Sequence, residues 1–518
     1  MSNKKLPIGV QNFESLRKDG YFYVDKTAHV YNMINRGKYY FLSRPRRFGK
    51  SLLLSTIEAD MQGKKELFEG LAIYDLEKEW VKHPIFHLDL NSQKYDTPES
   101  LEYVLEDALA YWESLYGANE SEKSFSLRFQ GIIRRACEKT GQRVVILVDE
   151  YDKPMLQAIG NEELQSTFRN TLKPFYGCLK SMDGYIKLGL LTGVTNFSHV
   201  SVFSDLNQLN DISMDYDYAT LCGITHDELI SNFSNEIEET AKSNDLSVEE
   251  TIREMTAQYD GYRFHHKAEG VFNPFSVLNC FFKKEFGSYW FQTGTPTFLV
   301  KLLQESDYDL RRLIEGVETS VSAFKEYRAE KNNPIPLIFQ SGYLTIKGYD
   351  KEFKLYNLGF PNDEVRYGFL NFLLPYYTPI SEDERGFYIG KFVQELKNGN
   401  TDAFMQRLEV FFADFPYELN DKTERHYQVI LYLVFKLMGQ FTQAEVHSAI
   451  GRADAIVQTT NYIYLFEFKL NGTAEEALQQ INEKQYALPF ETDGRKLFKI
   501  GVNFSSEKRN IDRWVVEE

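Results

Sequence analysis

A chain of 518 residues with a formal net charge of -16 and 26% charged residues has the composition of an acidic globular protein of two to four domains. The acidic balance argues against nonspecific attraction to nucleic acid or to an anionic membrane, so any DNA contact would need a local basic patch. The four cysteines have no metal-ligand spacing and no apolar stretch is long enough to span a bilayer, so we expect a cytoplasmic protein without disulfides or membrane segments.

Four apolar strands alternate with helices in the first part of the chain. The strands are expected at residues 38–42, 84–91, 143–150 and 185–195, and the clearest helices at residues 98–116 and 122–139. Continuous Val, Ile and Leu strands separated by helices indicate a parallel sheet with both faces covered. The sequence therefore predicts an α/β fold here.

The pattern changes twice further along the chain. From about residue 225 it becomes helical, and residues 336–365 are expected to form a helix and a hairpin, as in a winged helix, closed by Pro361 and Asn362. A helix at residues 421–438 then precedes three strands, a helix and two strands, and this order indicates a separate α/β domain. The expected domains are residues 1–222, 223–385 and 386–518.

A phosphate-binding loop is expected between the first strand and the following helix. Residues 44–51, RPRRFGKS, match the pattern GxxxxGKS/T except that Arg44 replaces its first glycine. N–H groups at a helix N-terminus favour a polyphosphate, Lys50 would contact its β- and γ-phosphates, and the Ser51 hydroxyl would bind Mg²⁺. The expected nucleotide-binding residues are Arg46, Arg47, Phe48, Gly49, Lys50 and Ser51. The two arginines could instead neutralise a partner surface.

Acidic residues follow the third strand, about 100 residues after this loop. Asp149 and Glu150 stand at the end of VVILV, where Asp149 would hold Mg²⁺ directly or through water and Glu150 would activate the attacking water. The next strand ends in Thr192 and Thr195, followed by Asn196, and a polar residue here either senses the γ-phosphate or caps the strand. The order and spacing of these groups predict an ATP site that supports hydrolysis.

A second set of charged residues lies near the C-terminus. Glu467 and Lys469 are two apart on a predicted strand and so face the same side, and Asp454 on the neighbouring strand can lie opposite them. Two carboxylates and a backbone carbonyl suit Mg²⁺ or Mn²⁺, and the lysine can orient a water and stabilise charge on a scissile phosphate. A solvated strand pair with a surface Glu–Lys contact remains the alternative.

Five motifs occur in order within residues 5–230, and they are LPIGVQNFESLRKDGYFYVDKT, SRPRRFGKS, ILVDEYDKP, LTGVTNFSHVSVFSDLNQLNDIS and LCGITHDE. Together they resemble the predicted AAA-ATPase-like family found in many anaerobic bacteria. The resemblance implies ATP binding and hydrolysis, includes Arg44 as part of the family's pattern, and suggests a homo-oligomer as an arrangement to test. It also includes the motif Asp25-Lys26-Thr27, whose role the residues themselves do not give.

Residues 420–505 resemble the PD-(D/E)XK nucleases in their D…ExK motif and in the order of their elements. Glu424 matches an acidic position of that core, Gln480 and Tyr486 match its QxxxxxY pattern, and Gly451-Arg452 precede the aspartate. The resemblance implies a restriction-endonuclease-like domain that binds a divalent metal.

The leading hypothesis is an ATPase joined to a metal-dependent nuclease that acts on DNA rather than RNA. ATP would bind the N-terminal domain and the middle region would transmit the nucleotide state, with ATP and Mg²⁺ as cofactors and Mn²⁺ as a second metal for the nuclease site. The alternative, which the acidic charge favours, is a nucleotide-dependent interaction switch whose nuclease-like domain binds a partner or nucleic acid but does not cut.

Overall fold

The computed structural model describes residues 5–195, 208–293, 315–320, 333–377, 382–413, 424–439, 443–446 and 453–518, and the single residues 299, 303 and 313. The chain forms two compact units. The first contains Met1–Tyr308 and Gly316–Val365, and the second contains Asp309–Glu315 and Arg366–Glu518. The expected division into three domains stays a prediction.

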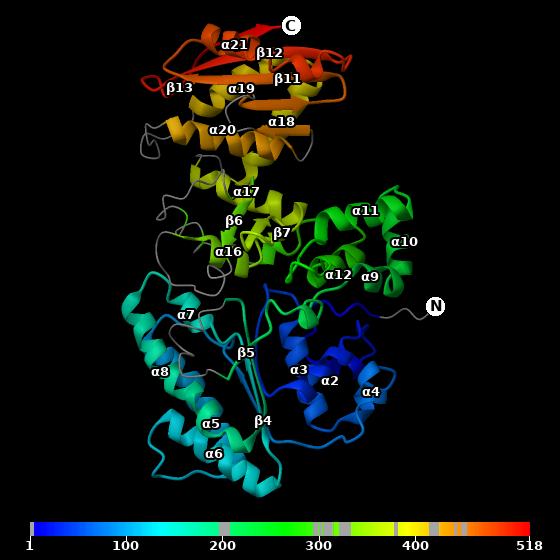
Figure 1. Ribbon diagram of the computed structural model, residues 1–518, viewed down its shortest axis with the longest axis vertical. Coiled ribbons are helices and arrows are strands. Elements are labelled where there is room, and N and C mark those ends of the chain that lie inside the picture. Colours follow the sequence, from blue (N-terminus) through cyan, green and yellow to red (C-terminus); the bar gives the residue numbers. More distant parts are fainter. Residues whose placement is uncertain are drawn as a thin grey trace. The chain divides into compact units, whose positions relative to one another are not determined.

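The first unit is built on a five-stranded parallel sheet with the strand order β2-β3-β4-β1-β5 (Figure 1). The strands are β1 (Tyr39–Ser43), β2 (Ile85–Asp89), β3 (Val144–Asp149), β4 (Ile186–Gly193) and β5 (Asn210–Asp211). Every residue of β3 is buried, as expected for a central strand covered on both faces. The predicted α/β fold is confirmed, and only the short β5 is absent from the sequence pattern.

Helices cover both faces of this sheet. One layer contains α1 (Phe13–Lys18), α2 (Thr27–Arg36), α3 (Lys50–Met61) and α4 (Ala72–Leu76), and the other contains α5 (Pro98–Tyr116), α6 (Phe125–Thr140) and α8 (Glu162–Ser181) (Figure 1). The second layer packs through aromatic rings, with the Phe129 and Phe175 centroids 4.8 Å apart in nearly parallel planes. Within the covered sheet, β3, β4 and β1 are neighbouring strands.

The motif Asp25-Lys26-Thr27 connects three helices through hydrogen bonds and an ion pair. The Asp25 carboxylate accepts from the Thr27 N–H over 2.8 Å, from the Thr27 hydroxyl over 2.7 Å and from the Ala72 N–H over 2.7 Å. Lys26 forms an ion pair with Glu228 in α9 (His226–Asn232), with an N–O distance of 2.6 Å. These contacts join the starts of α2 and α4 to α9, so the motif has a structural role in this fold.

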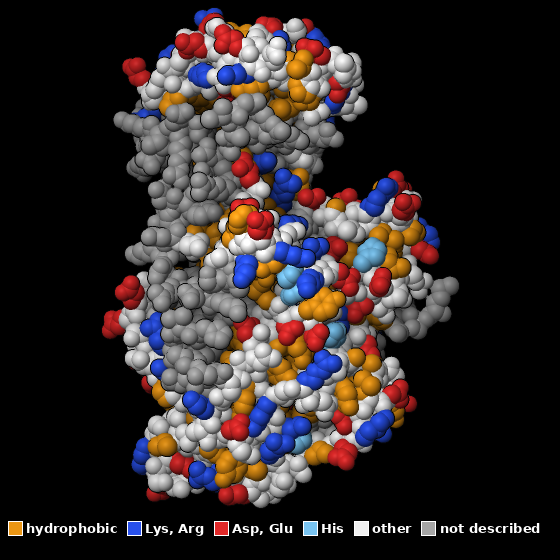
Figure 2. Space-filling view, viewed as in Figure 1, with side chains coloured by type: hydrophobic (Ala, Val, Ile, Leu, Met, Phe, Trp, Pro, Cys, Tyr) orange, Lys and Arg blue, Asp and Glu red, His pale blue; other side chains and the backbone are white. Residues whose placement is uncertain are grey.

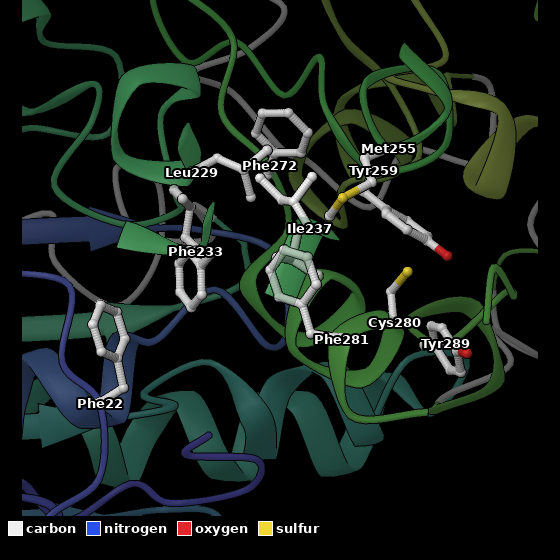
Figure 3. Packing of buried hydrophobic residues seen from close by; sticks show 12 residues of the cluster. Phe22, Leu229, Phe233, Ile237, Met255, Tyr259, Phe272, Cys280, Phe281 and Tyr289 are labelled. Atoms are coloured by element: carbon white, nitrogen blue, oxygen red, sulfur yellow. The ribbon is translucent and has the colours of Figure 1, made fainter. Parts of the chain in front are cut away.

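A helical region follows the sheet within the first unit. It contains α9, α10 (Ser234–Ser243), α11 (Val248–Tyr259) and α12 (Pro274–Lys283). Capping boxes at Thr225 and Ser247 start α9 and α11. Figure 3 shows the apolar core of this region, in which Phe22 of the N-terminal segment packs on Phe233, with ring centroids 4.8 Å apart. The N-terminal segment therefore contributes to the helical core.

The expected helix and hairpin are confirmed as α16 (Ile335–Gln340), β7 (Thr345–Asp350) and β8 (Leu355–Gly359), and β6 (Val317–Ser320) adds a third antiparallel strand beside β8. Pro361 and Asn362 do not close the hairpin, because the strands turn at residues 351–354. Asn362 instead accepts from the Val365 N–H over 3.1 Å and so starts α17 (Asp363–Tyr377).

The second unit combines helices with a five-stranded mixed sheet. Its helices are α18 (Glu382–Lys397), α19 (Thr401–Ala413), α20 (Glu424–Met438) and α21 (Ala474–Glu483), and its strands are β9 (Gln443–Val446), β10 (Ala455–Gln458), β11 (Tyr462–Leu470), β12 (Lys496–Ser505) and β13 (Asn510–Glu517). The strand order is β13-β12-β11-β10-β9, and α21 connects the parallel pair β11 and β12. Gly501 allows this helix to pack closely, because a Cβ there would lie 2.2 Å from the Ala474 carbonyl oxygen. The predicted order of elements is confirmed.

The described surface of the first unit has no dominant charge on the face shown in Figure 2, where acidic and basic side chains are interspersed. Among the residues with a described structure, no helix is both long and apolar enough to cross a bilayer.

The buried Asp60 carboxyl in α3 should make the stability of the protein depend on pH. Its side chain is 3% exposed, and burial raises its pKa to about 7. The unfolded chain ionises this carboxyl near pH 4, so the folded state loses stability as the pH rises from about 4 to about 7. Asp60→Asn should therefore stabilise the protein, with an advantage about 2–3 kcal/mol larger at pH 8 than at pH 5.

Urea unfolding followed by circular dichroism at both pH values measures this difference. Asp183→Asn is the matched control, because that carboxylate is mostly exposed and pairs with Lys38. An advantage of equal size at the two pH values would contradict the assignment.

Candidate nucleotide and metal sites

The loop between β1 and α3 has the backbone form that binds phosphate. Gly49 precedes α3 with a φ of 89°, and Arg47 has a φ of 63°. Residues in left-handed conformation allow successive N–H groups to form an anion-binding concavity. A Cβ at Gly49 would meet no atom within 4 Å, so the space beside it is open. The predicted loop can therefore admit a polyphosphate beside Gly49.

Lys50 is the first residue of α3, and its side chain bonds back to the loop. Its ammonium group donates to the carbonyls of Arg44 and Pro45, each over 3.0 Å. Burial lowers the pKa of Lys50, and the nearby Glu150 and Asp149 carboxylates oppose this effect. Phosphate oxygens would be stronger acceptors than the two carbonyls, because they carry charge.

Asp149 connects the loop to two neighbouring strands. Its carboxylate accepts from the Ser51 hydroxyl over 2.6 Å, from the Thr192 hydroxyl over 2.7 Å and from the Glu150 N–H over 3.0 Å. The structure thus brings Ser51, Asp149 and Thr192 together at the carboxyl ends of parallel strands. A carboxylate beside a hydroxyl supplies the hard oxygen ligands that Mg²⁺ prefers.

Glu150 has a strained backbone and a perturbed carboxyl group. Its φ of 49° is in the left-handed region, which is uncommon outside glycine and recurs at functional sites. Burial raises the pKa of Glu150, whereas the Lys50 and Lys153 ammonium groups lower it. The Lys153 Nζ atom is 3.8 Å from the Glu150 carboxylate. Such an environment suits a carboxylate that accepts a proton.

Arg44 is a buried anchor that the loop pattern alone does not predict. Its guanidinium donates to the carbonyls of Ser43 over 2.8 Å, Ser213 over 2.7 Å and Tyr218 over 2.9 Å, and lies 3.9 Å from the centroid of the Phe264 ring. These contacts fix the start of the loop where the common pattern has glycine. Phe264 is half-buried and packs against this guanidinium.

The remaining loop residues differ in exposure. Arg46 and Arg47 are exposed, and the Arg47 guanidinium lies 5.1 Å from the Phe275 ring centroid. The Phe48 side chain is 1% exposed and packs on Tyr262, with ring centroids 4.7 Å apart. Phe48 can therefore offer only its backbone to a ligand.

Asp152 is a second buried carboxylate, which sequence reasoning missed. It accepts from the Val194 N–H over 3.1 Å, from the Thr195 N–H over 2.6 Å and from the Thr195 hydroxyl over 2.5 Å. Thr195 thereby fixes the end of β4, and its neighbour Asn196 lies outside the described residues. Asp152 lies in the motif ILVDEYDKP, three residues after Asp149, but the motif does not give its role.

The C-terminal charged residues meet at the junction of β10 and β11. Asp454 accepts from the Phe468 N–H over 2.9 Å, and Glu467 accepts from the Asp454 N–H over 3.4 Å. Burial and the Asp454 charge raise the pKa of Glu467 to about 7. The Lys469 Nζ atom is 3.9 Å from the Glu467 carboxylate. A divalent cation would relieve the repulsion between these two carboxylates.

Gln480 of α21 completes this group. Its amide donates to Glu467 and accepts from Lys469, and its nitrogen lies 3.5 Å from the Tyr486 hydroxyl. Glu467 is 3% exposed, whereas the Lys469 side chain is 32% exposed, so the pair has a buried acid and a partly solvated base-bearing side chain. The Glu424 side chain, Gly451 and Arg452 lie outside the described residues. In the described part of the chain no cluster of three or more His, Cys, Asp or Glu side chains could hold a metal, so a metal here would depend on two carboxylates and a backbone carbonyl.

Two parts of the chain match known families. Residues 7–203 match the family described as predicted AAA-ATPase, and residues 422–514 match the PD-(D/E)XK nuclease superfamily. A protein of Azotobacter chroococcum mcd 1, described as an uncharacterized protein in the vnfD 5' region, is 35% identical over 527 residues, which cover 100% of this chain and 99% of that protein. The chain belongs to the predicted AAA-ATPase family and has a PD-(D/E)XK nuclease superfamily domain at its C-terminus.

Proposed function

We propose that the first unit binds and hydrolyses ATP. The observation that carries this proposal is the hydrogen bonding of Ser51 and Thr192 to one carboxylate, Asp149, beside the open space at Gly49. A purely structural loop would not require two hydroxyls and an acid from three separate segments to meet at that place. The geometry matches what a magnesium nucleotide needs.

Each group has a definite role in this reaction. The loop N–H groups and Lys50 bind the β- and γ-phosphates, and Ser51 and Asp149 hold Mg²⁺. The metal supplies positive charge against the phosphate oxygens when it is bound. Glu150 accepts a proton from the attacking water, and Thr192 keeps Asp149 oriented and can sense the γ-phosphate.

Lys50→Ala should weaken ATP binding about 100-fold, because a charged donor to the phosphates is lost. Titration with a fluorescent ATP analogue measures the affinity. Lys64→Ala is the matched control, since this lysine follows α3 and pairs with Glu14 outside the site. If Lys50→Ala binds ATP as tightly as the parent protein does, the loop is not the nucleotide site.

Glu150→Gln should separate binding from hydrolysis. The amide has nearly the same size as the carboxyl but cannot accept a proton, so ATP should still bind while phosphate release slows about 10²- to 10⁴-fold. The two measurements are nucleotide affinity and the rate of phosphate release. A variant that hydrolyses ATP at the parent rate would exclude Glu150 as the base.

We also propose that the C-terminal unit cleaves DNA with a divalent metal. The two carboxylates of Asp454 and Glu467 would hold Mg²⁺ or Mn²⁺ with a backbone carbonyl, and Lys469 would orient the attacking water and stabilise charge on the phosphate. Gln480 bonds to both Glu467 and Lys469 and so holds these two side chains beside each other. Domains of this fold also bind without cutting, so activity needs its own test.

Asp454→Asn should lower cleavage of supercoiled plasmid about 100-fold in Mg²⁺ or Mn²⁺, because it removes charge from the metal site while it keeps the acceptor for Phe468. Asp512→Asn is the control, since this carboxylate lies on β13 and pairs with Lys508. Gel electrophoresis measures nicking and linearisation.

Two results would change this picture. Equal cutting by Asp454→Asn and the parent protein would place the activity elsewhere. Parent protein that binds DNA and cuts it with neither metal would support the interaction switch, a function that the acidic net charge of -16 also favours. Repeating the assay with ATP and with Lys50→Ala shows whether the nucleotide controls cleavage.

A further inference from the structure

The indole of Trp290 holds one peptide unit of the phosphate loop. Its N–H donates to the Arg46 carbonyl over 2.9 Å, although the two residues are 244 positions apart in the sequence. Trp290 is 4% exposed, and its ring packs on Tyr343, with centroids 5.3 Å apart, and on Tyr262, with centroids 6.3 Å apart. The donor of this contact is therefore buried, whereas Arg46 is exposed.

This contact also fixes an N–H group of the loop. The carbonyl of Arg46 and the N–H of Arg47 belong to the same planar peptide unit and point in opposite directions. While the indole holds the carbonyl, the Arg47 N–H must point away from Trp290. Arg47 has a φ of 63°, so its backbone already has the left-handed form found in phosphate-binding loops.

A buried carboxylate holds Trp290 in turn. Glu364 is 1% exposed and accepts from the Trp290 backbone N–H over 2.6 Å and from the Ser276 hydroxyl over 2.7 Å. The Tyr259 hydroxyl lies 3.0 Å from the Gly287 carbonyl oxygen and so restrains the segment before Trp290. Burial raises the pKa of Glu364 to about 7, but the geometry alone defines this link.

Glu364 stands in the first turn of α17, which continues beyond the first unit. The helix runs from Asp363 to Tyr377, and the division between the units falls after Val365. A continuous chain of contacts within the first unit therefore joins the loop carbonyl, the indole, the carboxylate and the start of α17.

We propose that Trp290 is a positioning residue that presents the Arg47 N–H to the polyphosphate of the nucleotide. Glu364 holds Trp290 and so makes this presentation depend on the start of α17. The inference rests on the proposed binding of ATP. A phosphate that accepts from the Arg47 N–H polarises the same peptide and strengthens the bond from its carbonyl to the indole. Binding and the position of the helix start are then coupled in both directions.

Trp290→Phe tests this role because it keeps an aromatic ring and removes the N–H donor. In the full-length protein, the affinity for a fluorescent ATP analogue should fall about fivefold, the effect of one lost buried hydrogen bond. Unlabelled ATP should change the tryptophan emission of the parent protein, and this change should disappear in the variant. Trp112→Phe makes the same exchange at a tryptophan of α5 that is 3% exposed, and it should keep both properties.

Glu364→Gln tests the second link without altering the indole. A neutral amide has one acceptor atom where the carboxylate has two, so we expect a smaller loss of affinity, about twofold to threefold. Equal affinity and an equal emission change in Trp290→Phe and the parent protein would overturn the positioning role while ATP binding stands. A parent protein that binds no nucleotide would overturn both proposals. If circular dichroism shows that Trp290→Phe does not fold, Glu364→Gln decides, and unchanged affinity there overturns the role.

Discussion

The buried Asp149 carboxylate needs hydrogen-bond donors, and the geometry of the N-terminal site depends on this need. Asp149 is 4% exposed, and an ionised group at that depth is stable only with compensating donors. Ser51 supplies one from the phosphate loop and Thr192 another from β4. The same bonds bring the loop, β3 and β4 into one arrangement, so the stability of the fold and the geometry of the site have one cause.

Arg44 occupies the loop position at which the common pattern has its first glycine. A buried guanidinium needs acceptors for its N–H groups, and the carbonyls of Ser43, Ser213 and Tyr218 accept from its two terminal nitrogens. The stacking on Phe264 covers the face of the guanidinium. The loop is therefore held by side-chain contacts from distant segments, whereas a glycine would leave its start free to move.

The second unit also brings two acidic side chains close together. Burial and the charge of Asp454 raise the pKa of Glu467, and the Lys469 Nζ atom lies 3.9 Å from the Glu467 carboxylate. Gln480 satisfies Glu467 and Lys469 together but supplies no charge. Excess negative charge in a buried position attracts a cation. The packing of α21, which places Gln480 beside Glu467 and Lys469, therefore concerns the same side chains as the proposed binding of a metal.

The sequence by itself determined the α/β order, the loop at residues 44–51, the acids after β3 and the D…ExK pair, because each lies in a short segment whose periodicity or spacing is local. It did not predict the partners of Arg44, the role of Asp152 or the bond between Trp290 and Arg46. Those contacts join residues as far as 244 positions apart, and only the packed structure decides which distant donor reaches which buried acceptor.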